Sequence, residues 1–225
     1  MLLCIPNVLT ANEVAKLVEQ LQSADCWEEG RRTAGAVAAQ VKHNRQWMDG
    51  VQTGLSDFVL NKVQNNPEFI SATLPKTILP PKFNAYTGGE HYGLHVDSAL
   101  MHHPVLNESM RCDISATLFL CNPESYEGGE LQIETPFGAQ SIKLEAGSLV
   151  LYPSSSLHQV TPVTQGQRLA SFFWIQSRVQ DESVRASLYD LDQTIQVLRS
   201  LPTVPQEECL RLTGVYHNLL RRWVA

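Results

Sequence analysis

Two histidines and one aspartate are the residues of this sequence best suited to binding a metal ion. His95 and Asp97 are separated by a single residue, and His158 stands in a later segment. On an extended strand, side chains at alternate positions leave the same face, so His95 and Asp97 are expected to point to one place. The pair alone is a weak indication, because an exposed histidine and aspartate at a strand end would look the same. Together with His158, the three residues form the ligand set of non-haem iron(II) oxygenases.

Arg168 is a candidate for binding a carboxylate. The segments 158–163 and 167–176 predict two strands joined as a hairpin through residues 164–166, which would place Arg168 near His158 on the neighbouring strand. The residues after Arg168 are strongly apolar, and a buried arginine is costly unless it meets an anion. Its planar guanidinium suits a carboxylate partner. The alternative is an exposed arginine that follows the turn.

Other polar residues compete for roles in the same site. His91 shares the strand parity of positions 95 and 97, but His158 is preferred because it adds a second strand and brings Arg168 with it. In the apolar segment 114–120, we expect Thr117 alone to offer a polar group to a cofactor. His102 and His103 are expected in a loop beside the pocket, where exposure to solvent is favoured over the alternative of contact with a substrate.

The elements that must position these residues fall into three parts. Thr10 and Glu13 form a capping box that predicts a helix over residues 10–23, and apolar spacing over 51–63 predicts a second helix. Short β-favouring runs separated by glycine and proline turns then predict a β-sandwich or jelly roll; they cover 82–86, 92–96, 114–121, 130–134, 140–144, 148–152, 158–163 and 167–176. Apolar spacing over 184–198 and 209–223 predicts two C-terminal helices, whose apolar stripes could pack on the β core or bury a subunit interface.

Composition narrows the class of protein. The chain has 225 residues and a net charge of −6, which disfavours a nucleic-acid partner. No apolar run approaches the ~20 residues of a membrane span, and the first residues are unlike a signal peptide. The five cysteines are scattered, so we expect reduced thiols in a cytoplasmic protein rather than disulfides or a thiolate zinc site.

Several segments resemble the PKHD-type hydroxylases, a bacterial branch of the prolyl-4-hydroxylase-like Fe(II)/2-oxoglutarate dioxygenases. Besides the residues named above, the resemblance rests on 40–42 (QVK), 83–86 (FNAY), 115–120 (SATLFL), 126–131 (YEGGEL), 151–158 (LYPSSSLH) and 216–221 (YHNLLR). It therefore spans nearly the whole chain.

The resemblance implies a mainly β fold with flanking helices, of the α+β class, whose core is a double-stranded β-helix or jelly roll. We expect an N-terminal helical flank over 1–76, the catalytic core over 77–178 and a C-terminal helical subdomain over 179–225. His95, Asp97 and His158 would bind Fe(II), Arg168 would bind 2-oxoglutarate, and Tyr86 is a further candidate for that role. Tyr86 has an equal alternative as a core aromatic residue.

The resemblance also implies an activity. Such enzymes hydroxylate a C–H bond while 2-oxoglutarate becomes succinate and CO₂, and L-ascorbate keeps their iron reduced. The substrate, a small molecule or a peptide, is not indicated by any residue. Two other classes fit the same ligands: a jelly-roll module that senses metal and 2-oxoglutarate without turnover, and a cupin-like hydrolase or isomerase using another divalent metal.

Overall fold

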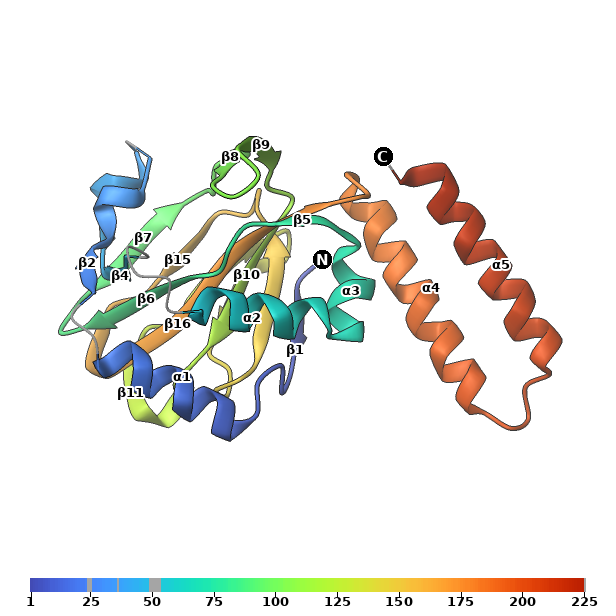
Figure 1. Ribbon diagram of the computed structural model, residues 1–225, viewed down its shortest axis with the longest axis horizontal. Helices are drawn as coiled ribbons and strands as arrows, with labels where there is room; N and C mark the ends of the chain where they lie inside the picture. Colours follow the sequence, from blue (N-terminus) through green and yellow to red (C-terminus); the bar gives the residue numbers. More distant parts are fainter. Residues whose placement is uncertain (24–25, 36, 49–53, 225) are drawn as a thin grey trace.

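Two antiparallel β-sheets form the centre of the molecule, with helices on one side and a helical hairpin at one end (Figure 1). The computed structural model describes residues 1–23, 26–35, 37–48 and 54–224. This arrangement confirms the expected mainly β fold with flanking helices and a jelly-roll core.

The larger sheet has nine strands, and its long strand β16 lies at the centre. The strand order is β1-β14-β10-β16-β6-β4-β2, and β11 and β5 also pair with β16. The strands are β1 (Leu3–Ile5), β2 (Trp27–Glu29), β4 (Arg45–Trp47), β5 (Pro75–Ile78), β6 (Lys82–Thr87), β10 (Ile114–Phe119), β11 (Tyr126–Gly128), β14 (Leu149–Pro153) and β16 (Val163–Ser177).

The smaller sheet has five strands in the order β13-β12-β15-β7-β3. They are β3 (Lys42–His43), β7 (His91–His95), β12 (Leu131–Thr135), β13 (Gly138–Ile142) and β15 (His158–Val160). A separate hairpin pairs β8 (Leu100–His103) with β9 (Glu108–Arg111).

The larger sheet is covered on both faces, so its strands are apolar without a strict polar alternation. On β10, Ala116 and Leu118 belong to the core that the sheet shares with the helices, whereas Phe119 belongs to a second core between the two sheets. On β6, Phe83 lies in the first core and Tyr86 in the second. The second core leaves room at one end for polar residues, and the candidate site lies there.

Three helices cover the outer face of the larger sheet: α1 (Ala11–Ser23), α2 (Leu55–Gln64) and α3 (Pro67–Thr73) (Figure 1). The capping box of α1 is present, since Thr10 N–H donates to Glu13 Oε2 at 2.9 Å and Glu13 N–H donates to Thr10 Oγ1 at 3.3 Å. The start of the second predicted helix at 51 lies outside the described residues.

The N-terminal part is less helical than predicted. It contributes strands β1 to β5 to the sheets, together with the short helix α3, which the sequence pattern did not indicate. Helix α3 begins at Pro67 with Asn66 as its cap, whose side chain accepts a hydrogen bond from Phe69 N–H at 2.9 Å. A seven-residue helix and strands of two to four residues are too short to show a clear hydrophobic periodicity.

The C-terminal helices form the predicted appendage: α4 (Glu182–Ser200) and α5 (Gln206–Trp223) pack against each other and project from the β core (Figure 1). Helix α4 rests on α3, where Tyr189 Oη donates to Glu68 at 3.0 Å and Ser71 Oγ donates to Asp192 at 2.6 Å. Among the described residues, no helix is long and apolar enough to cross a membrane.

Candidate metal centre

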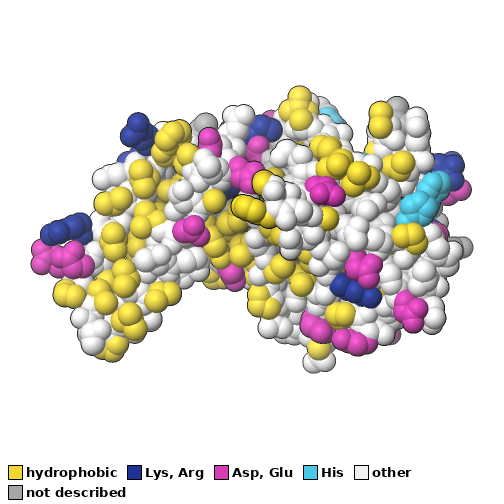
Figure 2. Space-filling view, turned by 180° about the vertical axis from the view of Figure 1, so that it is seen from behind, with side chains coloured by type: hydrophobic (Ala, Val, Ile, Leu, Met, Phe, Trp, Pro, Cys, Tyr) yellow, Lys and Arg dark blue, Asp and Glu magenta, His cyan; other side chains and the backbone are white. Residues whose placement is uncertain are grey.

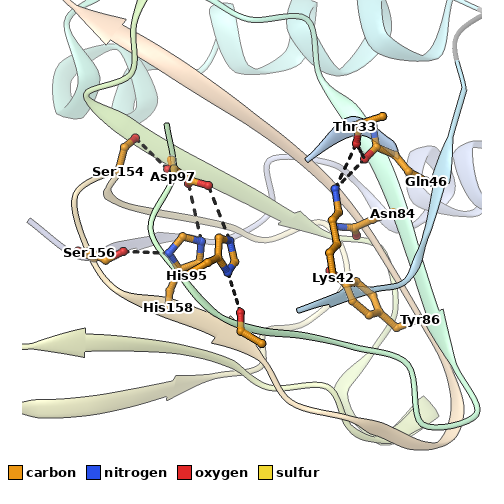
Figure 3. A network of polar contacts seen from close by, with 12 residues as sticks. Thr33, Lys42, Gln46, Asn84, Tyr86, His95, Asp97, Ser154, Ser156 and His158 are labelled. Carbon is orange, nitrogen blue, oxygen red and sulfur yellow. Dashed lines mark hydrogen bonds and ion pairs between the residues drawn. The ribbon is translucent and has the colours of Figure 1, made fainter. Parts of the chain in front are cut away.

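His95, Asp97 and His158 lie together at one end of the space between the sheets (Figure 3). One ligand atom from each residue fits within a cluster whose members lie no more than 4.8 Å apart. His95 Nε2 is 3.8 Å from Asp97 Oδ1, and His158 Nε2 is 3.7 Å from Asp97 Oδ2. The two histidines are direct neighbours across strands β7 and β15, whereas Asp97 follows the end of β7.

Backbone carbonyls determine which ring nitrogen of each histidine faces the centre. The Nδ1 atom of His95 lies 2.8 Å from Gly93 O, and that of His158 lies 2.9 Å from Ser156 O. A carbonyl oxygen only accepts hydrogen bonds, so each Nδ1 carries the proton and donates it. Both Nε2 atoms are therefore free to bind a metal ion, and the rings are already oriented for it.

Burial keeps His95 in the neutral form that metal binding requires. Its pKa is lowered to about 4, first because the ring is removed from water and then because His158 lies beside it. The rings of Tyr92 and His95 are stacked with centroids 3.6 Å apart, which restricts the orientation of His95 further. Neutral imidazole is the metal ligand, so this site needs no proton loss from His95 at neutral pH.

Ser115 orients Asp97, a role that the sequence analysis missed. Its hydroxyl donates to Asp97 Oδ2 at 2.6 Å and shares a second hydrogen bond with Ser154 Oγ at 2.8 Å. The expectation that Thr117 alone faces the site from segment 114–120 is therefore wrong. Ser115 and Thr117 occupy alternate positions of β10, and both line the pocket, so strand parity could have indicated them together.

Arg168 enters the same pocket from the opposite sheet, and the predicted hairpin is wrong. Strand β15 pairs with β12 and β7, whereas β16 begins at Val163 in the other sheet, where Arg168 is paired with Tyr86 on β6. The chain crosses between the sheets at residues 161–162 instead of turning at 164–166. His158 and Arg168 therefore face each other across the core. Turn residues show that the chain changes direction, but they do not show whether the next strand joins the same sheet or the other one.

The Arg168 side chain is buried among aromatic rings without an ion pair among the described residues. It is 1% exposed, and its Nε and Nη1 atoms have no hydrogen-bond partner. The guanidinium carbon lies 5.3 Å from the ring centroids of both Tyr86 and Phe119. Since unpaired buried donors are costly, this cation is well placed for an anionic ligand to complete its interactions.

Tyr86 lies beside Arg168 and is fully buried. Burial raises the pKa of its phenol, so the hydroxyl is a neutral donor. Asn84 Nδ2 donates to Tyr86 Oη at 3.4 Å, a long hydrogen bond. The hydroxyl lines the pocket that holds the histidines, so it is available to a ligand that reaches Arg168.

The pocket has a cavity volume of about 120 Å³ and extends beyond the metal cluster to Lys42. Lys42 is 5% exposed, and its ammonium group donates to Gln46 Oε1 at 3.0 Å and to Thr33 Oγ1 at 3.3 Å (Figure 3). Burial, followed by the nearby charge of Lys82, lowers the pKa of Lys42 to about 8. The sequence analysis noted segment 40–42 only as part of a resemblance and assigned no role to this lysine.

The remaining histidines near the site have other surroundings. The ring of His91 lies 4.9 Å from that of His43 and is not part of the cluster. His102 is exposed, as expected, but the expectation of an exposed His103 is wrong. His103 is buried, its Nε2 lies 3.2 Å from Ile78 O, and its Nδ1 accepts from the amides of Val105 and Leu106, so it shapes the turn that follows β8.

The donor sets suit iron(II) and 2-oxoglutarate. Two imidazoles and one carboxylate on one side of a metal leave coordination positions open on the other side. 2-Oxoglutarate has a carboxylate at each end, and one of these would match the unpaired donors of Arg168 in the same pocket.

Two family descriptions match consecutive parts of the chain. Residues 81–176 match the "2OG-Fe(II) oxygenase superfamily", and residues 182–225 match the "PKHD-type hydroxylase C-terminal domain". The first match includes all candidate site residues named from the sequence, and the second covers the helical hairpin.

Curated relatives match over the full chain. A PKHD-type hydroxylase of Acidovorax ebreus (strain TPSY) is 56% identical over 99% of both chains, and one of Teredinibacter turnerae (strain ATCC 39867 / T7901) is 55% identical over 99% of both chains. Among solved structures, a Pseudomonas putida prolyl-4-hydroxylase is similar in fold, with a TM-score of 0.59 and 21% identity. That match covers 79% of this chain and 92% of the other.

Proposed function

Because the chain belongs to the PKHD-type hydroxylases of the 2OG-Fe(II) oxygenase superfamily, we propose that it hydroxylates its substrate at a site built by His95, Asp97, His158 and Arg168. The observation that carries this proposal is the single pocket that contains both the cluster of three ligands and the buried guanidinium with unpaired donors. As an enzyme of this family it uses iron(II) and 2-oxoglutarate.

Each residue has a separate task in the proposed reaction. His95 and His158 present neutral Nε2 atoms, and Asp97, held by Ser115, presents a carboxylate oxygen to the metal. Arg168 binds the distal carboxylate of 2-oxoglutarate, and Tyr86 donates its hydroxyl to the same group. Iron(II) and 2-oxoglutarate supply the activation of O₂, so that one oxygen atom enters succinate, CO₂ is released and the other oxygen atom enters a substrate C–H bond.

We further propose that L-ascorbate maintains the iron in the reduced state and that the enzyme works in the cytoplasm. All five cysteines are free, which suits a reducing compartment where iron(II) is available. The substrate is a small molecule or a peptide.

Arg168→Ala tests the proposal directly. We expect wild-type protein loaded with iron(II) to develop a visible absorbance band on anaerobic addition of 2-oxoglutarate, and to release succinate slowly in air. Arg168→Ala should raise the 2-oxoglutarate concentration needed for half of either signal at least about tenfold, because the carboxylate loses a bidentate charged partner.

Arg178→Ala is the matched control, since Arg178 is exposed immediately after β16. It should leave the 2-oxoglutarate requirement unchanged. An unchanged requirement in Arg168→Ala would remove Arg168 from the cosubstrate site. A wild-type protein that shows the absorbance band but never releases succinate would instead be a sensing module.

A further inference from the structure

Lys42 is a second buried cation of the pocket. Among the described residues, its ammonium group donates to two uncharged acceptors, Gln46 and Thr33. Its Nζ atom also lies 5.3 Å from the ring centroid of Tyr92 and 5.8 Å from that of Phe172. Neutral amide, hydroxyl and aromatic groups solvate an ammonium ion only partly, so burial of Lys42 remains unfavourable.

The formal charges in the pocket also indicate that the site can bind an anionic substrate. Asp97 is the only carboxylate among the described residues that line the pocket, whereas Lys42, Lys82 and Arg168 are cationic. The formal charges of iron(II), Asp97, dianionic 2-oxoglutarate and Arg168 cancel. The charge of Lys42 is then left over in this part of the pocket, and a negative group on the substrate would balance it.

Lys42 is also close enough to the metal cluster to contact a bound substrate. The Tyr92 ring links the two, because it is stacked on His95 with ring centroids 3.6 Å apart and lies 5.3 Å from Lys42 Nζ. These two distances bound the separation between Lys42 Nζ and the His95 ring centroid at about 9 Å. A chain of a few carbon atoms spans that gap.

Several apolar side chains line the pocket and suit contact with a hydrocarbon chain. They are Phe172 and Trp174 of β16, Val96 after β7 and Met101 of β8. The ring centroids of Phe172 and Trp174 are 5.5 Å apart in an edge-to-face arrangement. The pocket therefore combines a buried cation, a set of apolar side chains and the candidate metal ligands.

We propose that the substrate is a small organic acid whose carboxylate is bound by Lys42 while its hydrocarbon part reaches the metal centre. This proposal rests on the proposed function, since it assumes that Arg168 is occupied by 2-oxoglutarate. Lys42 is in this view a specificity-determining residue, and Gln46 and Thr33 hold its ammonium group in place.

The test measures binding of acids and of their neutral counterparts to protein loaded anaerobically with iron(II) and saturating 2-oxoglutarate. The probes are butanoate, hexanoate and phenylacetate, each compared with its primary amide. Binding is followed by the change that each probe causes in the visible absorbance band. We expect at least one acid to bind at least tenfold more tightly than its amide.

Three variants separate the charge of Lys42 from its structural contacts. Lys42→Gln should weaken acid binding at least tenfold and abolish the preference over the amide, whereas Lys42→Arg should retain the preference. Gln46→Glu keeps Lys42 but places a carboxylate beside it, so it should also abolish acid binding. Lys76→Gln, at an exposed position of β5, should bind acids as wild type does.

The outcomes are distinguishable from failure of the proposed function. Loss of the 2-oxoglutarate band in wild-type protein would contradict the proposed function itself. With the band present, the proposal is overturned if no acid binds more tightly than its amide, if Lys42→Gln keeps the preference, or if Lys42→Gln weakens 2-oxoglutarate instead. A glutamate-containing blocked tripeptide that binds more tightly than every free acid would overturn the assignment to a small molecule.

Discussion

The polar residues at the candidate metal centre are held by short, local contacts. Backbone carbonyls two residues before each histidine fix the ring protons of His95 and His158, and Ser115 fixes one oxygen of Asp97. These second contacts decide which atoms face the metal. Loss of such a partner commonly lowers metal affinity by about 10- to 100-fold.

Ser115→Ala tests this at the scale of one hydroxyl group. The substitution leaves Asp97 in place but removes its 2.6 Å hydrogen bond, so the carboxylate can turn away from the two imidazoles. We expect metal affinity to fall about 10- to 100-fold. The measurement is competition with a chromophoric chelator for Mn²⁺ or Zn²⁺. Ser109→Ala, at an exposed position of β9, is the control, and equal affinities in the two variants would contradict the role of Ser115.

The buried ammonium group of Lys42 should lower the free energy of unfolding at neutral pH. Its pKa is lowered from 10.5 to about 8 by burial and by Lys82, while Asp97 opposes the shift. Between about pH 8 and 10.5 the unfolded chain binds more protons at this residue than the folded chain does, so its cost is relieved as the pH rises through that window. Below pH 8 both states are protonated and the full cost remains.

Lys42→Met should therefore stabilise the metal-free protein at pH 7 by about 1–3 kcal/mol, with a gain that shrinks toward pH 10.5. The upper figure corresponds to the pKa shift, and the lost hydrogen bonds to Gln46 and Thr33 reduce it. Urea unfolding in the presence of a chelator, at pH 7 and at pH 10, measures the difference. Lys76→Met should show no such pH dependence, and a destabilised Lys42→Met at pH 7 would contradict the prediction.

At the scale of elements, strand β16 carries Arg168 and pairs with β11, so Arg168 lies beside the turn that follows β11. Gly129 has a φ of +66°, and a Cβ atom there would lie 3.1 Å from Arg168 Cδ, 2.8 Å from Val163 Cγ2 and 2.9 Å from Tyr126 Cε2. Gly88 has a similar φ of +57° but has open space around the corresponding position. Both glycines thus adopt a left-handed backbone conformation, but only a side chain at position 129 would contact Arg168.

Gly129→Ala and Gly88→Ala should have similar backbone costs, about 1–2 kcal/mol each. Only Gly129→Ala presses on the side chain of Arg168, so only it should weaken 2-oxoglutarate binding, by about tenfold or more. Titration of the iron(II)–2-oxoglutarate band gives the affinities, and thermal melting gives the stabilities. Equal 2-oxoglutarate affinities would show that the turn does not position Arg168.

At the scale of the whole molecule, the C-terminal hairpin is separate from the site. Helix α5 packs mainly against α4. Hydrophobic side chains are visible on the surface of the hairpin (Figure 2). Leu210 is 63% exposed and Val215 is 46% exposed. The expectation that these helices bury a subunit interface stays a prediction. So do the expected boundaries of the three parts of the chain at 76 and 178.

The double variant Leu210→Glu/Val215→Glu tests whether the C-terminal helices bury a subunit interface. If the hairpin joins two copies of the chain, the wild-type protein should sediment as an oligomer and the double variant as a monomer, because charges oppose burial in an apolar interface. The 2-oxoglutarate affinity should not change, since these residues lie outside the pocket. Wild-type protein that sediments as a monomer over a wide concentration range would contradict the prediction.

Local patterns in the sequence were sufficient to predict several helices and the mainly β character of the core. The capping box of α1, the apolar spacing of α4 and α5, and the alternation of short strands with turns all depend on neighbouring residues, and the structure confirms them. The spacing of His95 and Asp97 depends on strand parity, which is also local. The resemblance to PKHD-type hydroxylases is confirmed by relatives that match along the full chain.

Contacts between distant strands were decided only in the tertiary structure. His158 lies opposite His95 because β15 pairs with β7, and Arg168 faces them because β16 belongs to the other sheet. Ser115 and Lys42 joined the site in the same way, from segments whose own residues do not reveal which strands they pair with. The sequence of a short strand indicates which side chains share a face, but it does not indicate which strand it pairs with. The pairing depends on how the whole chain buries both faces of the two sheets.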